Sequence, residues 1–436
     1  MRDHLLRLLR LHDASPLERA ATLWTAAFFF TVLCAYYLMR PLREEIGAAF
    51  GNENLLLLFV QTFALITLLN PVYMVLANRL PTSRFLPGVL HSFAASFVVL
   101  ALVSGMLPPL QQGVLAWDSI ESVVAAFVYS WVTAFVVCGV ALVWVHAVDF
   151  FTTQQGKRLF GFVSVGGTLG AIAASALALV SSEVPRQWVM LVAAGVLEIG
   201  VLCYRRSLRA CQAMVGGNHH ERARIASAGP FEGLRLLVRS RYLLGIAAFA
   251  LLAAVAATAF YYTLTEMART QIAASEDRRA LFSAINLLQN ICALVIQVWV
   301  TRSALLRLGL ALVLCIMPAI SLLGLSLAAV LPLVGVMAVF EVARRTMQFA
   351  FDKPAREVLF TPLGIEEKYK SKAFIDTAVL RFGDLVGAAV NDLLVRLHIG
   401  ASTVAAGAAP FVIFWGGIGW WLGRRSREQE SQPSTA

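Results

Sequence analysis

Long apolar runs recur from one end of this chain to the other, and they restrict the possible folds more than any other feature. Each run holds about 18–22 residues, which as a helix cross a hydrocarbon core about 30 Å thick. Only 14% of the 436 residues are charged, whereas a soluble domain carries roughly a quarter. We therefore predict an all-α polytopic membrane protein with about twelve transmembrane helices. The predicted spans are residues 20–39, 54–76, 85–106, 123–145, 160–180, 188–203, 243–262, 281–300, 308–325, 328–342, 373–394 and 404–422.

The lysines and arginines are distributed unevenly among the segments that connect these spans. With the N-terminus in the cytoplasm, the predicted cytoplasmic segments hold 28 of the 36 lysines and arginines. Membrane proteins keep such residues on the cytoplasmic side, so the asymmetry supports an even number of spans with both termini in the cytoplasm. The net charge of +10 then reflects topology and contact with anionic lipid, not the binding of nucleic acid.

The longest predicted cytoplasmic connection separates the first six spans from the last six. Major facilitator transporters have this layout, with two halves related by internal repetition, so we predict a major facilitator-like 6+6 pseudo-symmetric bundle. Its predicted parts are a cytoplasmic amphipathic N-terminus at 1–19, an N-terminal six-helix bundle at 20–203, a basic cytoplasmic linker at 204–242, a C-terminal six-helix bundle at 243–423 and a cytoplasmic tail at 424–436. In the first part, Met1 to Asp13 has the pattern of a helix that lies on a membrane surface.

A weak internal repeat agrees with two related halves. The fifth span contains Gly166 and Gly170, and its counterpart, the eleventh, contains Gly383 and Gly387 at the same four-residue spacing. Such pairs let helix backbones approach closely. We interpret them as packing surfaces and not as phosphate loops, because no Gly-Lys-Ser/Thr follows.

The end of the first span carries an unusual number of charges. Tyr36, Arg40 and Arg43 fall on one helical face, Glu44 follows, and Pro41 weakens the helix between them. Ionisable groups at membrane depth are expensive and usually functional. The cluster therefore predicts a binding site for an anion, with an ordinary helix end closed by Arg–Glu pairs as the alternative.

The eleventh span is also rich in ionisable groups. Lys372 and Asp376 are four residues apart, and Arg381 and Asp384 three apart, so each pair can offset part of its desolvation. We predict that this span lines a polar cavity. The preceding stretch, which includes Arg344, Arg345, Lys353 and Arg356, is interpreted mainly as a solvated cytoplasmic loop.

Smaller polar signals complete the candidate site. Asp149 lies at the end of the fourth span, and Glu266 and Arg269 lie just beyond the seventh. Asn286 and Asn290 are one helical turn apart in the eighth span, and either face a substrate or bond neighbouring helices.

No pattern typical of metal binding or catalysis is found. The six cysteines show no C-x-x-C pairing, and His146 stands alone. We expect no metal, no cofactor and no enzymatic activity.

Four stretches resemble the ATP/ADP translocase family, the nucleotide transport proteins of bacteria and plastids. They are FDKPARE from Phe351 to Glu357, YKSKAFID from Tyr369 to Asp376, RFGD from Arg381 to Asp384, and GKRLFG around Lys157 and Arg158. Arg40-x-x-Arg43-Glu44 is similar to a further motif of that family. The resemblance implies a carrier in a bacterial inner membrane that exchanges nucleotides, or related phosphate-bearing anions, without hydrolysing them.

The resemblance also implies roles for single residues. Arg43 and Lys372 fall where the family has lysines, and Asp149 falls near a family carboxylate. The family's acidic residue in the seventh helix precedes a basic one by four, which from Arg269 gives Thr265 and leaves Thr265 and Glu266 as alternatives.

We therefore predict a monomeric carrier in the lipid bilayer for a small anionic substrate such as ATP or ADP. The alternatives are a proton-coupled major-facilitator carrier of another organic anion, and a non-transporting scaffold or sensor with a carrier fold. The predicted substrate-binding residues are Tyr36, Arg40, Arg43, Glu44, Asp149, Asn286, Asn290, Lys372, Asp376, Arg381 and Asp384. The predicted gating or motif residues are Lys157, Arg158, Glu266, Arg269, Lys353 and Arg356.

Overall fold

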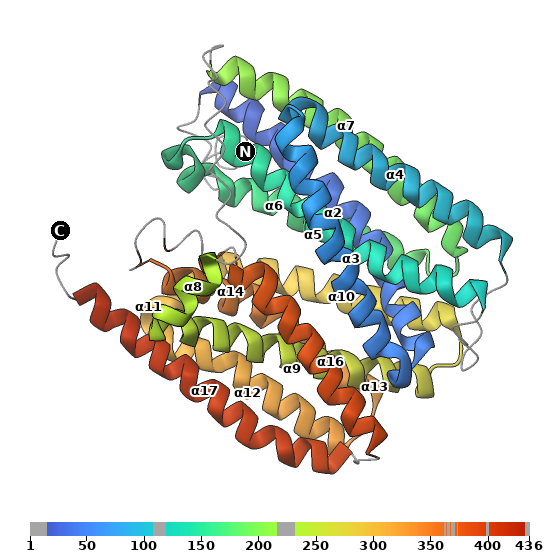
Figure 1. Ribbon diagram of the computed structural model, residues 1–436, viewed down its shortest axis with the longest axis vertical. Helices are drawn as coiled ribbons and strands as arrows, with labels where there is room; N and C mark the ends of the chain where they lie inside the picture. Colours follow the sequence, from blue (N-terminus) through green and yellow to red (C-terminus); the bar gives the residue numbers. More distant parts are fainter. Residues whose placement is uncertain are drawn as a thin grey trace. The chain divides into compact units, whose positions relative to one another are not determined.

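In the part of the chain that the computed structural model describes, all of the regular secondary structure is helical (Figure 1). The described residues are 15–107, 119–215, 232–361, 363, 367, 371–372, 374–397 and 401–431. The predicted surface helix from Met1 to Asp13 lies outside these ranges.

Within the described residues, twelve long helical segments overlap the twelve predicted spans. Those of the first half are α2 (Pro16–Phe50), α3 (Asn52–Arg79), α4 (Thr82–Met106), α5 (Ile120–Phe150), α6 (Thr153–Val180) and α7 (Arg186–Val215). Those of the second half are α9 (Arg241–Gln271), α10 (Ser275–Trp299), α12 (Gly309–Val330), the run of α13 (Val334–Met347), η1 (Gln348–Asp352) and α14 (Lys353–Leu359), the pair η2 (Ile375–Val379) and α16 (Leu380–Arg396), and α17 (Ala401–Ser431). Two short helices, α8 (Glu232–Arg239) and α11 (Thr301–Arg307), lie between them.

Within the described residues, nine of these helices are long and apolar enough to cross a membrane. The other three are the run containing α13, the pair η2 and α16, and α17. In the first two, a π-helical turn adjoins the α-helix, so that α13 has 14 residues and α16 has 17 and neither is long enough by itself.

Several helices continue past the apolar run that predicts them. Helix α2 continues through Pro41, so this proline does not end the helix. It ends at Phe50, and the next residue, Gly51, has a φ of 70°, in the left-handed region that glycine adopts without strain. Helix α7 likewise reaches Val215, and α8 lies inside the predicted linker at 204–242. Hydropathy reports the part of a helix that lipid can surround, whereas the hydrogen-bond ladder continues until a residue ends it.

The chain forms two compact units. Unit 1 takes in the described residues of Met1–Ala49, Gln61–Arg224 and Ala274–Leu287, and unit 2 those of Phe50–Val60, Ile225–Ala273 and Leu288–Ala436. Helices α3 and α10 therefore supply residues to both units. The predicted boundaries of the linker, between residues 203 and 204 and between residues 242 and 243, remain predictions.

In unit 1, α6 packs closely on α2. A Cβ atom added to Gly166 would lie 2.5 Å from the Ala26 carbonyl oxygen, and one added to Gly170 would lie 2.2 Å from that of Phe30. Only glycine permits such an approach. Helix α4 packs along α7 in the same unit.

Unit 2 repeats this pairing between the equivalent helices. A Cβ added to Gly383 would lie 2.7 Å from Ala254 Cβ, and one added to Gly387 would lie 2.8 Å from Thr258 Cβ, both on α9. Helix α12 packs along α17, and Trp415 is fully buried among apolar neighbours. The interpretation of both glycine pairs as packing surfaces is confirmed, and their matching partners agree with the predicted internal repeat.

Candidate functional site

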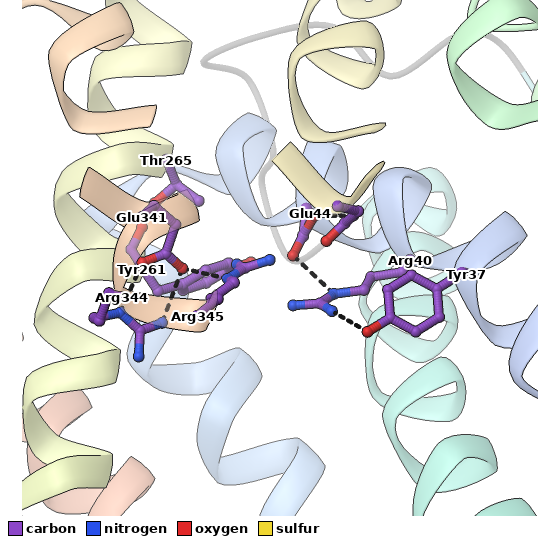
Figure 2. A network of polar contacts seen from close by, with 9 residues as sticks. Tyr37, Arg40, Glu44, Tyr261, Thr265, Glu341, Arg344 and Arg345 are labelled. Carbon is purple, nitrogen blue, oxygen red and sulfur yellow. Dashed lines mark hydrogen bonds and ion pairs between the residues drawn. The ribbon is translucent and has the colours of Figure 1, made fainter. Parts of the chain in front are cut away.

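The charged end of α2 forms a buried network inside unit 1 (Figure 2). Arg40 donates from Nε to Glu44 Oε1 at 3.1 Å and from Nη1 to the Tyr37 hydroxyl at 3.2 Å. Its guanidinium carbon also lies 5.8 Å from the centre of the Tyr36 ring. The Glu44 side chain is 1% exposed and that of Arg40 13%. A helix end that merely snorkels would keep its charges at the surface, so this burial favours a functional cluster.

Arg43 extends from α2 to α5. Its Nε donates to Thr133 Oγ1 at 2.8 Å, and its guanidinium lies 4.1 Å from the centre of the Tyr129 ring. A guanidinium over an aromatic face is held by the ring's negative face. Arg43 is thus placed in the interior of unit 1 by a hydroxyl and a ring.

The first half of α10, which belongs to unit 1, is tied to the same end of α2. Asn286 Nδ2 donates to Glu44 Oε2 at 3.1 Å, so Asn286 bonds a neighbouring helix. Arg278 Nη2 lies 3.2 Å from Glu45 Oε1, and the two side chains are 1% and 5% exposed. Sequence reasoning missed the pair because residue 278 falls in a predicted loop, where an arginine needs no explanation.

A pocket of about 320 Å³ lies beside this pair within unit 1. Its lining carries both signs of charge, because Glu45, Arg186, Glu276 and Arg279 contribute to it. Arg279 also donates to the Val184 carbonyl oxygen at 2.9 Å. The pocket is polar, without a clear preference for one sign of charge.

Unit 2 contains a second buried ion cluster, on α13 (Figure 2). Arg344 makes two bonds to Glu341, from Nε at 2.8 Å and from Nη2 at 2.9 Å. Arg345 Nε donates to the same carboxylate. The side chains of Glu341, Arg344 and Arg345 are 0%, 5% and 7% exposed.

The interpretation of Arg344 and Arg345 as part of a solvated loop is therefore wrong. The helix extends well past residue 342, where the apolar run ends, and Glu341 lies one helical turn before both arginines. Because the three charges lie on one face of the helix, their ion pairs offset part of the cost of desolvation. The helix can therefore continue through this stretch with the charges buried. The spacing E-x-x-R-R could have indicated this cluster in the sequence. A hydropathy profile alone treats these three charges as the end of the transmembrane helix.

A third cluster joins α14 to η2 in unit 2. Arg356 lies 3.1 Å from Asp352 Oδ2 and 3.8 Å from Asp376 Oδ1, and both carboxylates belong to π-helical turns. Lys372 lies 2.7 Å from Glu357 Oε2, so the structure gives it a carboxylate other than the predicted Asp376. Because a π-helical turn holds an extra residue, it rotates the next part of the helix and changes which side chains share a face.

The other predicted residues are more dispersed. The Arg381–Asp384 pair is confirmed, at 3.0 Å, although both side chains are about one-third exposed, at 35% and 28%. Glu266 and Arg269 lie inside α9 and form an ion pair at 2.6 Å. Thr265 is buried and bonds its own helix.

The remaining residues contribute less to a common site. Asn290 is 6% exposed in the part of α10 that belongs to unit 2. Asp149 is half-buried near the end of α5, and Lys353 is exposed. Arg158 lies 3.1 Å from Glu18 Oε1, which ties α6 to α2. Lys157 belongs to α6, and its side chain lies outside the described part of the chain.

His146 belongs to a separate buried polar cluster in unit 1. Its Nε2 is 2.8 Å from Ser207 Oγ, which in turn is 2.8 Å from Thr25 Oγ1. Among the described residues, no group of three or more His, Cys, Asp or Glu side chains is arranged to hold a metal ion.

No protein-family model and no curated protein matches the sequence. Several solved structures resemble it over nearly its whole length. A bacterial homologue of the iron transporter ferroportin, in an inward-facing state, has a TM-score of 0.61 at 11% identity and covers 96% of this chain and 100% of its own. A bacterial homologue of the human lysosomal transporter Spinster has a TM-score of 0.57 at 12% identity, with 97% and 100% covered. The nucleoside transporter NupG has a TM-score of 0.53 at 14% identity, with 96% and 100% covered.

Identities this low show the fold alone. The prediction of an all-α polytopic membrane protein with a major facilitator-like fold is thereby confirmed.

Proposed function

We propose that this polytopic membrane protein is an alternating-access transporter that exchanges nucleotides or related phosphate-bearing anions. The fold supports transport, since the similar structures are those of transporters. The motif resemblance to the ATP/ADP translocase family supports the class of substrate.

One observation carries the proposal: each unit places arginine side chains in its interior next to carboxylates. In unit 1 the α2 end and α10 place Arg40, Arg43 and Arg278 beside Glu44 and Glu45. In unit 2 two arginines share one glutamate on α13. Charged groups inside a membrane protein are costly and usually functional, and guanidinium groups held by carboxylates can exchange those partners for a mobile anion.

The residue types suit a phosphate group. The planar guanidinium presents paired donors that match the oxygens of a phosphate, and charge-assisted bonds of this kind are the strong ones. Arg40 and Arg43 would hold the substrate in unit 1, where Tyr36 and Tyr37 offer rings on which a base can stack.

Counterflow in proteoliposomes tests the proposal. Vesicles that hold purified protein and unlabelled ATP should accumulate labelled ATP or ADP from outside, and vesicles without internal nucleotide should not. Arg43→Gln should reduce exchange at least tenfold. The matched control is Arg425→Gln, which removes an exposed arginine whose pair with Glu428 is about half-exposed on both sides, and it should leave exchange unchanged.

A proton-coupled carrier of another organic anion is the second candidate, favoured by one observation. Asp352 and Asp376 share Arg356, and the Oδ1 atom of Asp352 is buried without a hydrogen-bond partner. A carboxylate in that position is suited to take up a proton. Uptake that needs a pH gradient and no internal anion would support this candidate and contradict exchange.

The absence of transport would point elsewhere. If neither a nucleotide nor a proton gradient drives any uptake, and Arg43→Gln leaves every cellular phenotype intact in a folded protein, the chain is a scaffold or sensor with a carrier fold.

A further inference from the structure

Unit 1 contains a second pocket, formed by residues of α3, α4 and α5. Its volume is about 330 Å³, which is within the range of sites that hold small molecules. None of its twelve lining residues is charged. Tyr73 and Phe85 are two of them, with ring centres 4.9 Å apart. This pocket is therefore apolar, in contrast to the polar one beside Glu45.

The pocket is open at the surface of the transmembrane helices. Val72, Leu76 and Leu80 of α3 line it and are 54%, 41% and 37% exposed. On α4 it is lined by Gly88, where an added Cβ atom would have no other atom within 4 Å. Both helices are long and apolar enough to cross a membrane. An apolar opening on such helices faces hydrocarbon, so its occupant enters from the bilayer.

Two arginines flank one end of this pocket. Arg79 lies seven residues after Val72 on α3, and Arg84 lies four residues before Gly88 on α4. Each arginine therefore shares a helical face with a residue that lines the pocket. Both arginine side chains are exposed, and the connection between α3 and α4 is predicted to face the cytoplasm. At that place a long side chain holds its guanidinium at the level of the lipid headgroups.

We propose that this pocket binds an anionic phospholipid of the cytoplasmic leaflet. An acyl chain fills the apolar space, and Arg79 and Arg84 hold the phosphate of the headgroup. Basic residues at the cytoplasmic membrane surface attract anionic lipids, and guanidinium donors match the oxygens of a phosphate. A second copy of the chain, with its net charge of +10, is a poorer match to two exposed arginines.

The bound lipid would stabilise the protein at one particular helix. The pocket residues of α3 belong to unit 1, whereas residues 50–60, which include the start of the same helix, belong to unit 2. A lipid between α3, α4 and α5 holds the unit 1 part of α3 against its neighbours. A ligand that binds only the folded state raises the denaturation temperature. This inference does not depend on which substrate the protein carries.

Native mass spectrometry of the purified full-length protein tests the proposal, because it counts bound lipids. Phosphatidylglycerol is compared with phosphatidylcholine of identical acyl chains. Phosphatidylglycerol should bind at least tenfold more tightly, since each basic residue near an anionic headgroup contributes about a fivefold gain. It should also raise the thermal denaturation temperature in detergent more than phosphatidylcholine does.

Two kinds of variant separate the chain from the headgroup. Gly88→Trp places a large side chain in the open space of the pocket, so the affinity for both lipids should fall at least tenfold. Arg79→Gln combined with Arg84→Gln should abolish the preference for phosphatidylglycerol and leave the affinity for phosphatidylcholine unchanged. If Gly88→Trp does not fold, Gly88→Leu fills less of the pocket and should weaken both lipids to a smaller extent.

Each variant has a matched control in unit 1. Gly161→Trp on α6 adds the same side chain at another glycine with no atom near an added Cβ, but outside the pocket. Arg205→Gln combined with Arg209→Gln removes two exposed arginines from α7. Neither control should change the affinity for either lipid.

Three outcomes would overturn the proposal. The first is equal affinity of the unmodified protein for the two lipids. The second is the same loss of lipid binding from Gly161→Trp as from Gly88→Trp. The third is a dimer that carries no lipid and dissociates in Gly88→Trp, which would identify a second copy of the chain as the occupant. None of these outcomes bears on the proposed transport of anions, which counterflow tests separately.

Discussion

Single side chains in the interior are held by ion pairs whose loss should be costly. Arg278 and Glu45 are the clearest case, with side chains 1% and 5% exposed and atoms 3.2 Å apart. Removing one member breaks a buried ion pair, which typically costs about 3–5 kcal/mol. Arg278→Ala should therefore lower the thermal denaturation temperature strongly in detergent.

A matched variant at the surface gives the comparison. Arg425→Ala breaks an ion pair that is about half-exposed on both sides, and such pairs contribute about 0–1 kcal/mol. The double variant Arg278→Met with Glu45→Gln should recover part of the loss, because it removes both charges. Equal denaturation temperatures for Arg278→Ala and Arg425→Ala would contradict the burial argument.

Residues also show what the sequence could and could not predict of the site. Arg40, Arg43 and Glu44 stand out because they adjoin an apolar run, and the structure places them in one buried region of unit 1. Arg278 does not stand out, since it falls in a predicted loop among other charges, and Glu341 lies at the very end of the predicted tenth span, next to charges that are typical of a loop. Which of several charges turns inward depends on packing against another helix, and a single sequence does not contain that information.

At the scale of the helix, close packing through glycine should tolerate almost no change. A Cβ on Gly170 would lie 2.2 Å from the Phe30 carbonyl oxygen, so α6 and α2 would have to separate. We expect Gly170→Ala to destabilise the protein by about 1–3 kcal/mol, as overpacking typically does.

The same helix supplies the control. Gly161 has no atom within 4 Å of an added Cβ, so Gly161→Ala should be neutral or stabilising, since alanine is a better helix former by about 0.5–1 kcal/mol. Both variants are compared by thermal denaturation in detergent. A similar loss of stability at both positions would mean that the helices do not touch at Gly170.

Helices were predicted more reliably than their ends. Each apolar run marks a helix, because a span of lipid requires one. The ends depend on local features such as the positive φ of Gly51 and the capping box of Thr152 with Gln155. The structure of the eleventh span departs further from the prediction than the others. Its π-helical turn at Ile375–Val379 rotates the residues that follow, which changes the side chains that share one face of the helix.

For the whole molecule, the distribution of positive charge predicts which side each connection faces. Alkaline phosphatase is active only outside the cytoplasm, so a fusion after Ser182 should be active and one after Ser240 inactive. A fluorescent protein at the C-terminus should fold and emit light. The physical basis is the preference of lysine and arginine for the cytoplasmic side.

The reverse pattern of reporter activity would overturn the topology while leaving the fold intact. The fold itself was predictable because twelve apolar runs and a central basic connection leave few alternatives. The substrate was not, since a carrier fold accepts many solutes and the choice depends on a few interior side chains.

The two π-helical turns have a consequence for how the gene can change. Removing one residue from a transmembrane helix rotates everything beyond it by about 100°, which normally misplaces every later contact. A π-helical turn holds one residue more than an α-helical turn, so a deletion within Gln348–Asp352 or Ile375–Val379 can be absorbed as an ordinary turn. Related genes that differ in length within their helices should therefore gain or lose a codon in these two stretches.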